Sequence, residues 1–166
     1  MTDIAAAQLD RVLSFFERTD SKITGLFAVD AGVLAISGLN VHLDDLNECK
    51  VMVALGLSSA MLVASLFQLY IAYSPHLSGG SRSSLVYFRD IGSLSENDYI
   101  QKVRAQNDSE RMDDLLSQVW RNSEILTIKF RKLKWAFRFT ALSLIPWLTF
   151  LTLVSIRHSQ MPRLLS

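Results

Sequence analysis

The sequence has few of the residues from which catalytic and metal sites are usually built. Its 166 residues include one cysteine, Cys49, and three histidines, His42, His76 and His158. A single cysteine cannot form a disulfide within the chain, so it gives no information on the compartment. We expect the histidines to lie far apart and on different sides of the membrane whose topology is derived below. We therefore predict no metal site, no Cys–His pair and no enzymatic activity.

Signals for a phosphate-binding loop and for a cleavable leader are also missing. Gly79-Gly80 lacks the Gly-Lys-Ser/Thr that follows in a P-loop, so we predict a connector at 78–81. The segment Met1–Leu13 lacks the basic start and apolar run of a signal peptide, which predicts that the first span acts as its own insertion signal. The net charge is only +1. This charge gives no general attraction to nucleic acid, and we expect no nucleic-acid partner.

The chain does have apolar residues grouped in long blocks. Hydrophobic residues make up 49% of it and the mean hydropathy is +0.22, which is too apolar for an ordinary soluble domain of this size. A helix needs roughly 17–25 residues to cross a bilayer. Three blocks approach or reach this length: Ile23–Leu39, Val51–Tyr73 and Phe139–Ile156. The predicted fold class is an all-α, multi-span membrane protein with three transmembrane helices and a small helical cytoplasmic domain.

Composition divides the chain into five predicted parts. They are a cytoplasmic amphipathic helix (1–22), a transmembrane helical hairpin (23–73), a cytoplasmic helical sensor region (74–135), a third transmembrane helix (136–157) and a tail (158–166). In the sensor region, Ser95 predicts the start of a helix over Glu96–Ala105, and Asn107–Ser109 predicts the cap of a long helix. Leu85–Phe88 is a short apolar patch that fits either a strand or a helical edge.

The long predicted helix, Ser109–Ile156, carries an apolar stripe that only Ser123 interrupts. The stripe consists of Met112, Leu116, Val119, Leu126, Phe130, Leu133 and Phe137. Its spacings of three and four predict packing against a partner helix. It runs into a basic and aromatic segment, 129–138, which is typical of an anionic cytoplasmic membrane surface. We expect one continuous helix, which would transmit changes in its soluble half to the third span.

The charge bias of the connections predicts the orientation. Residues 74–138 contain eleven Lys and Arg against eight Asp and Glu, whereas residues 40–50 carry a net charge of −2. Because Lys and Arg are enriched in cytoplasmic loops, we predict a cytoplasmic N-terminus, an outer hairpin connection and an outer tail. Arg157 and Arg163 in the tail run against this rule.

Polar residues in and beside the predicted spans are candidates for gating. They are Asp20, Lys22, Asp30 and Gln68. A carboxylate inside a span costs about 2.5–3.5 kcal/mol on insertion scales, so Asp30 should face protein or water. Asp20 and Lys22 would gate or latch the bundle at its cytoplasmic mouth, or form a solvated face.

Depth in the spans groups further polar residues into two levels. The first contains Asp30, Ser65, Gln68, Ser143 and Pro146, and the second contains Ser37, Ser59 and Thr152. These residues either join helices by hydrogen bonds or line a water path when the spans separate. Gly56, Ala60 and Ala64 allow close approach of a second helix, which is consistent with oligomerisation.

Trp120-Arg121-Asn122 is the polar interruption on the cytoplasmic helix that best fits a ligand site. Arg121 can pair with a phosphate, Asn122 can bond a base edge and Trp120 can stack. Alternatively, Trp120 packs on the Leu85–Phe88 patch and Arg121 is solvated. Arg89 is a further phosphate-binding candidate, as are Arg82 and Arg104.

Several segments, in their order along the chain, resemble the Pycsar membrane effectors. They are 11–22, the span with Asp30, 85–91, 115–126 and the basic segment before the last span, so the likeness covers roughly Gln8 to Ser155. The resemblance implies a bacterial antiphage protein of the inner membrane. A partner pyrimidine cyclase, without required direct contact, would make cyclic CMP or cyclic UMP on infection. The effector would sense this nucleotide, without any other cofactor, and impair the membrane in abortive infection.

The resemblance leaves the ligand site open. A β-roll cyclic-nucleotide domain does not fit into 74–108, so recognition must come from the helical cytoplasmic part, for example between subunits of a homo-oligomer. We hypothesise that nucleotide binding near Trp120–Asn122 and Arg89 shifts the long helix and the third span with it. The competing interpretation is a non-signalling membrane scaffold or assembly subunit, because an amphipathic stripe also serves to bind a protein partner.

Overall fold

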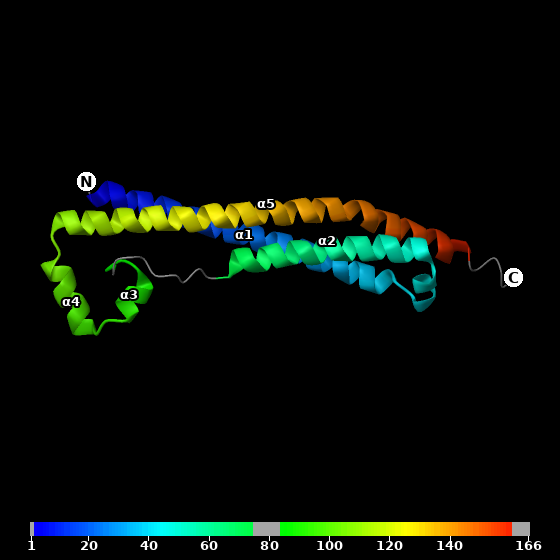
Figure 1. Ribbon diagram of the computed structural model, residues 1–166, viewed down its shortest axis with the longest axis horizontal. Helices are drawn as coiled ribbons and strands as arrows, with labels where there is room; N and C mark the ends of the chain where they lie inside the picture. The colour runs from blue at the N-terminus through cyan, green and yellow to red at the C-terminus, as the bar shows by residue number, and fades with distance from the viewer. Residues whose placement is uncertain (1, 75–83, 161–166) are drawn as a thin grey trace. The chain divides into compact units, whose positions relative to one another are not determined.

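The computed structural model describes residues 2–74 and 84–160. Its elements are α1 (Thr2–Asn40), the short 3₁₀ helix η1 (Leu43–Asn47), α2 (Cys49–Tyr73), α3 (Phe88–Gly92), α4 (Glu96–Ala105) and α5 (Asp108–Gln160) (Figure 1). The described residues contain no strand, which confirms the all-α class. The predicted connector at 78–81, His76, Arg82 and residues 161–166 of the tail lie outside the described residues.

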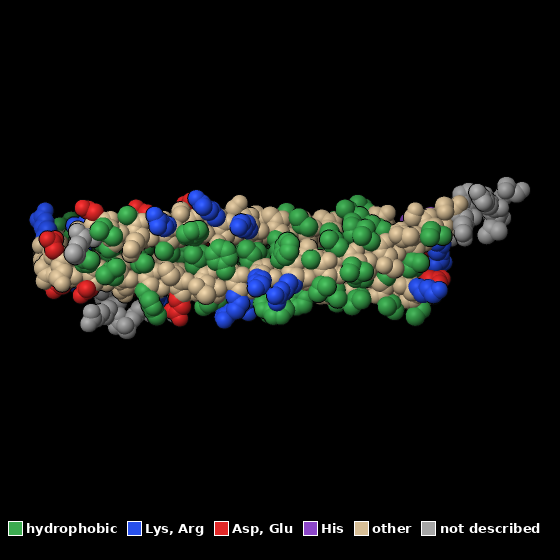
Figure 2. Space-filling model, turned by 90° about the horizontal axis from the view of Figure 1, so that it is seen from above, with side chains coloured by type: hydrophobic (Ala, Val, Ile, Leu, Met, Phe, Trp, Pro, Cys, Tyr) green, Lys and Arg blue, Asp and Glu red, His purple; other side chains and the backbone are tan. Residues whose placement is uncertain are grey.

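Three helices are long and apolar enough to cross a membrane. They are α1, α2 and α5, as predicted, and each contains an apolar window with few charged residues. Figure 2 shows Lys and Arg side chains gathered beside a stretch of surface that contains only apolar and uncharged atoms. This separation of charge from apolar surface is typical of a protein that crosses a bilayer.

The chain forms two compact units. The first consists of Met1–Asp20 with Ser74–Lys129, and the second consists of Ser21–Tyr73 with Phe130–Ser166. Helices α1 and α5 contribute to both units, and neither helix is interrupted between its ends. The predicted continuity of the long helix is therefore confirmed, over a length of 53 residues.

In the first unit, the beginning of α1 lies beside the beginning of α5 (Figure 1). Ala5, Leu9 and Leu115 form its apolar core. The helix starts follow local capping, because the Ser95 hydroxyl accepts the backbone N–H of Asp98 at 3.2 Å and fixes the start of α4. Helix α4 spans the predicted residues.

The start of α5 is a reciprocal capping pair. The Asn107 side chain accepts the backbone N–H of Glu110 at 2.8 Å, and the Glu110 carboxylate accepts the backbone N–H of Asn107 at 3.0 Å. The Leu85–Phe88 patch is no strand, because its first three residues form a bend and Phe88 begins α3. Hydrogen bonds between the side chains of Asn107 and Glu110 and the backbone thus fix the start of α5.

In the second unit, the later part of α1, helix α2 and the later part of α5 lie side by side (Figure 1). Two apolar clusters hold them together. The first contains Ile23, Leu69, Ala72 and Ala136, and the second contains Val51, Ala54, Phe150 and Val154. Many large apolar side chains face outward instead, as suits a lipid-facing surface, and these include Phe67, Ile145 and Leu148.

The buried face of α5 differs from the predicted apolar stripe. Leu116, Phe130 and Phe137 are 40%, 43% and 64% exposed. The buried residues of this helix are Leu115, Gln118, Lys129, Ala136, Thr140, Ser143, Phe150 and Val154. They recur at spacings of three, four or their sums, which defines a helix face. Hydrophobic periodicity did not find this face because half of its members are polar.

Candidate ligand cavity and membrane polar network

A cavity of about 550 Å³ lies in the first unit, lined by α4, α5 and the segment before α3. Its lining consists of Ser84, Leu85, Lys102, Ala105, Gln106, Glu110, Asp113, Asp114, Ser117, Gln118 and Arg121. The volume is within the roughly 300–1,000 Å³ of sites that bind small molecules. The cavity is therefore large enough for a small ligand.

One wall of this cavity is fixed by carboxylates that accept backbone N–H groups. Asp114 of α5 accepts the N–H of Leu85 at 2.8 Å, and Asp90 of α3 accepts the N–H of Ser84 at 2.8 Å. The buried Ser84 hydroxyl accepts two more backbone N–H groups, each at 3.1 Å. Hydrogen bonds to a charged acceptor are among the stronger ones, so this wall is held firmly against α5.

The cavity offers charges of both signs. Lys102 and Arg121 supply cationic donors, and Glu110, Asp113 and Asp114 supply carboxylate acceptors. Guanidinium and ammonium groups bind phosphate, and carboxylates accept hydrogen bonds from amino and hydroxyl groups. A ligand that combines an anionic group with N–H and O–H donors fits this chemistry.

The structure separates the residues of the predicted ligand triplet. Arg121 lines the 550 Å³ cavity, and Asn122 lines a neighbouring cavity of about 420 Å³. Trp120 is 69% exposed. Arg89 of α3 is also exposed and lines neither of these two cavities. Because successive helix residues point about 100° apart, the triplet does not address one ligand as a unit.

The Arg121 guanidinium lies over an aromatic ring of the Leu85–Phe88 patch. The Arg121 Cζ atom lies 5.8 Å from the centre of the Tyr87 ring. The alternative in which Trp120 packs on the patch and Arg121 is solvated does not fit the exposure of Trp120. A cation over an aromatic face is stabilised by the ring's electron density, so Tyr87 helps to place Arg121.

Sequence reasoning missed most of the cavity lining. Lys102, Asp114 and Gln118 were not predicted to share a site with Arg121. A signal was present, because Asp114, Gln118 and Arg121 recur at spacings of four and three and so lie on one face of α5. The contribution of α4 could not be found in this way, because it depends on tertiary packing.

The predicted latch residues lie in different units. In the first unit, Asp20 accepts a hydrogen bond from the Lys129 ammonium at 2.6 Å, and Lys129 also lies 5.1 Å from the Phe16 ring. Lys22 belongs to the second unit, where it lines an apolar cavity with Phe130, among others. The ion-pair partner of Asp20 on α5 is therefore Lys129, which is buried.

Asp30 in the second unit belongs to a chain of hydrogen bonds that joins all three long helices. It is fully buried, as expected, and accepts a hydrogen bond from the Thr140 hydroxyl at 2.7 Å. The Ser65 hydroxyl lies 3.0 Å from that of Thr140 and 3.1 Å from the Ala136 carbonyl. The other Asp30 oxygen and the side-chain oxygen of Gln68 are buried without a hydrogen-bond partner among the described residues.

The second predicted level of polar residues in the spans, formed by Ser37, Ser59 and Thr152, is only partly present. Ser37 is buried and accepts a hydrogen bond from the Trp147 indole at 3.0 Å. The buried serine of α2 at this level is Ser58, not the predicted Ser59. Thr152 is exposed and bonds to the Leu148 carbonyl of its own helix. A depth count along each span does not give the direction in which a side chain points.

Comparison with known families decides the identity of the chain. The sequence profile of PycTM, described as the Pycsar effector protein domain, matches residues 4–156. The chain belongs to the Pycsar effector family. No curated protein and no solved structure matches it. Membership and the three apolar helices support an antiphage effector in a membrane, and the family implies a cyclic nucleotide signal.

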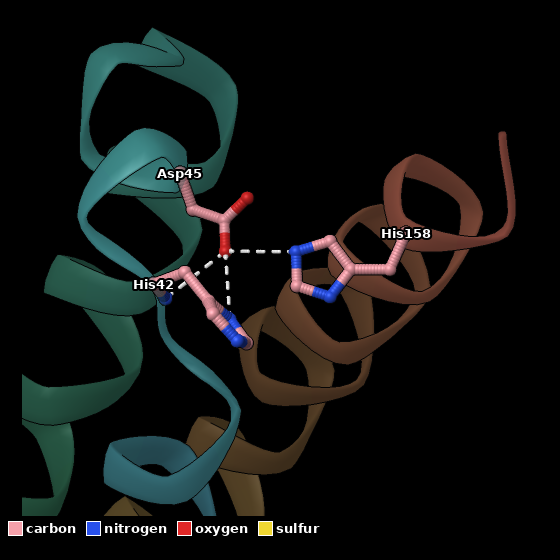
Figure 3. Close-up of side chains that lie close together, drawn as sticks. All are labelled: His42, Asp45 and His158. Carbon is pink, nitrogen blue, oxygen red and sulfur yellow. Dashed lines mark hydrogen bonds and ion pairs between the residues drawn. The ribbon is translucent and has the colours of Figure 1, made fainter. Parts of the chain in front are cut away.

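One polar cluster of this Pycsar effector contradicts an expectation from the sequence. His42, Asp45 and His158 lie together in the second unit, with all three ligand-type atoms within 4.8 Å of one another (Figure 3). The prediction that the histidines are far apart is wrong for His42 and His158, because the α1–α2 connection and the end of α5 meet. Their ring centres are 4.4 Å apart.

Proposed function

We propose that a cyclic pyrimidine mononucleotide, cyclic CMP or cyclic UMP, binds in the 550 Å³ cavity and activates this effector to impair the bacterial inner membrane. The infected cell then dies before the phage is released. The observation that carries the proposal is the continuity of α5. This helix supplies six lining residues, between Glu110 and Arg121, to the cavity and continues without interruption into the third candidate span.

The charges of the cavity support nucleotide binding. In the proposed complex, Arg121 and Lys102 pair with the cyclic phosphate, whose single negative charge needs a cationic partner. Asp113 and Asp114 accept hydrogen bonds from the ribose hydroxyl and the base. Cytosine carries an amino donor where uracil carries a carbonyl acceptor, and carboxylates accept from that amino group. The acidic lining thus favours cyclic CMP over cyclic UMP.

Coupling to the membrane follows from unequal affinity for two states. A nucleotide can shift α5 only if it binds the active arrangement more tightly than the resting one. In the first unit, the resting arrangement includes the 2.6 Å pair between Lys129 of α5 and Asp20 of α1. We infer that activation moves α5 along or about its axis relative to α1 and breaks this pair.

The membrane defect is proposed to arise at the Asp30 network. In the resting state Thr140 donates a hydrogen bond to one oxygen of Asp30, and Ser65 is bonded to Thr140, away from lipid. Movement of α5 takes Thr140 away from Asp30 and leaves a carboxylate inside the span. Such a group requires water or another partner, because an unpaired charge in hydrocarbon is costly. Water entry along this line would depolarise the membrane.

Self-association and orientation complete the proposal. Gly56 and Ala60 of α2 are exposed, and a Cβ added at Gly56 would meet nothing within 4 Å. This surface remains available to a second copy of the chain. In the first unit, Leu116 and Trp120 are exposed one turn apart on α5, so this unit offers a second copy an apolar surface of its own. We propose a homo-oligomer with its N-terminus in the cytoplasm, served by a cyclase that need not touch it.

A binding and depolarisation assay tests the proposal. The full chain in lipid nanodiscs is titrated with cyclic CMP, cyclic UMP and cyclic AMP, and potential is recorded in liposomes with the same nucleotides. Binding and depolarisation by a cyclic pyrimidine nucleotide support the proposal. No affinity for any of them would overturn it and favour the non-signalling scaffold, whose test is co-purification of a protein partner.

A further inference from the structure

We propose that His42, Asp45 and His158 form a binding site for a divalent transition metal ion of the Zn²⁺ class. The ion would join the α1–α2 connection to the last turn of α5 in the second unit. This site is separate from the nucleotide cavity of the first unit, and its existence does not depend on the proposed signal.

The spacing of the three side chains fits metal ligands better than hydrogen bonds. The Nδ1 atom of His42 and the Nε2 atom of His158 each lie 3.6 Å from the same oxygen of Asp45. An N–H···O hydrogen bond is shorter, at about 2.7–3.2 Å. Two ligands of a tetrahedral zinc ion, with bonds of about 2.0–2.2 Å, are about 3.4 Å apart. The two His–Asp separations are close to that value, and all three ligand atoms lie within 4.8 Å of one another.

The ligand types and their directions point to the same class of ion. Two imidazoles and one carboxylate are a common set for Zn²⁺, and they leave a fourth position for water. Figure 3 shows both rings directed toward the Asp45 carboxylate from different parts of the chain. The His42 side chain is 60% exposed, so it can turn to complete the coordination and an ion can enter from that side.

The carboxylate is buried and held in place before any ion binds. Asp45 is fully buried, and one of its oxygens accepts the backbone N–H of His42 at 3.1 Å. The backbone N–H of Asp45 donates to the His42 carbonyl at 3.0 Å. The second oxygen of Asp45 has no hydrogen-bond partner among the described residues. The oxygen that faces both imidazoles is the one that accepts the His42 N–H, and the unsatisfied oxygen is the other one, which calls for a donor of its own beside the metal site.

Arg157 is the competing source of positive charge and must be weighed against an ion. Its Nε atom lies 3.6 Å from the second oxygen of Asp45, and its Nη1 atom lies 4.0 Å from Glu48. With neutral histidines, these three charged side chains sum to one negative charge, which still attracts a cation. Arg157 would then pair with the Asp45 oxygen that does not bind the metal. Ligating carboxylates commonly make such a further contact.

The test uses the full chain in detergent after treatment with a chelator. Co²⁺ is added as the probe, its tetrahedral absorption band is recorded, and the bound Co²⁺ is displaced with Zn²⁺. The cluster variants are His42→Ala and His158→Ala. His76→Ala is the matched control, because it removes the third histidine of the chain, which the proposal does not use.

We expect one ion per chain in the wild type and in His76→Ala, with affinity at least about tenfold weaker in each cluster variant. Zn²⁺ should raise the melting temperature of the wild type and of His76→Ala, but not of the cluster variants, since only a folded site binds. This second readout shows that the variants fold. The absence of stoichiometric binding in the wild type would overturn the proposal. Arg157 alone would then supply the positive charge beside Asp45. Equal weakening in His76→Ala would also overturn the proposal.

Discussion

The two units of this effector treat polar side chains in opposite ways. In the first, Lys102, Asp113 and Arg121 line an open cavity, and the apolar core is small. In the second, polar groups such as Asp30 and Thr140 are buried and bonded to one another between two apolar clusters. Charges that line a cavity can receive a ligand, whereas the buried groups bond mainly to one another and leave one Asp30 oxygen without a hydrogen-bond partner among the described residues. We therefore propose that the first unit recognises the ligand and that the second unit gives the membrane response.

The largest effect is expected from removing the cationic group of the cavity. Arg121→Gln leaves a ligand phosphate without its guanidinium, and a hydrogen bond to a charged group contributes about 1.5–3 kcal/mol. Nucleotide affinity should therefore fall by roughly ten- to a hundredfold, and nucleotide-triggered cell death should be lost. Titration calorimetry and growth after induction of the nucleotide measure the two effects.

Arg111→Gln is the control for this variant, because Arg111 lies on the same helix but does not line the cavity. It should behave as the wild type. If Arg121→Gln bound nucleotide as tightly as Arg111→Gln, recognition would have to be assigned elsewhere than to this cavity.

Asp30→Leu should separate binding from the membrane response. The change removes the carboxylate that attracts water between the spans, so depolarisation should be abolished. Affinity for the nucleotide should stay within about twofold, because Asp30 belongs to the second unit. Calorimetry in nanodiscs and a potential-sensitive dye in liposomes report the two properties. Depolarisation at the wild-type level would assign Asp30 to structural bonding between helices alone.

A smaller effect is expected at the ion pair of the first unit. Lys129→Gln removes the 2.6 Å contact with Asp20, and Asp20 is 38% exposed at its side chain. A partly exposed pair contributes about 1 kcal/mol, so basal depolarisation without nucleotide should rise by about three- to tenfold. The exchanged variant, Asp20→Lys with Lys129→Asp, should return it toward the wild-type level. A double variant as leaky as the single one would argue against the pair as a latch.

The smallest predicted effect concerns the choice of base. Asp113→Asn replaces a carboxylate by an amide, which both donates and accepts, so the preference for cyclic CMP over cyclic UMP should narrow by a few-fold. Competition between the two nucleotides for a labelled one measures the ratio. An unchanged ratio would exclude Asp113 from contact with the base.

Features set by local interactions were predictable from the sequence. Ser95 and Asn107 mark the starts of α4 and α5, because a capping side chain bonds to backbone three residues ahead. The three apolar helices and the continuity of α5 follow from composition and period. The family was also recognisable from the order of its segments, and the matched profile confirms it.

Features set by packing between distant segments were not predictable. Lys129 and Asp20 are 109 residues apart in the chain, and Thr140 and Asp30 are 110 apart. Hydrophobic periodicity selected Phe130 and Phe137, while the helix buries Lys129 and Ala136. In a sequence, a buried polar residue cannot be told from a surface residue until its partner is known. The prediction from the sequence alone therefore placed the buried face of α5 on the neighbouring side of the helix.

The central claim, that unbroken α5 couples the two units, is tested by breaking the helix between them. Arg131 is an exposed residue of α5 in the basic segment. Arg131→Pro adds a second proline to a helix that already contains Pro146, and it kinks or breaks the helix at this point, whereas Arg131→Ala removes the same charge and keeps the helix. Membrane potential is measured in liposomes with saturating nucleotide, after binding is verified for both variants. The account predicts that Arg131→Ala depolarises and that Arg131→Pro binds nucleotide without depolarising. Equal depolarisation by the two variants would contradict it.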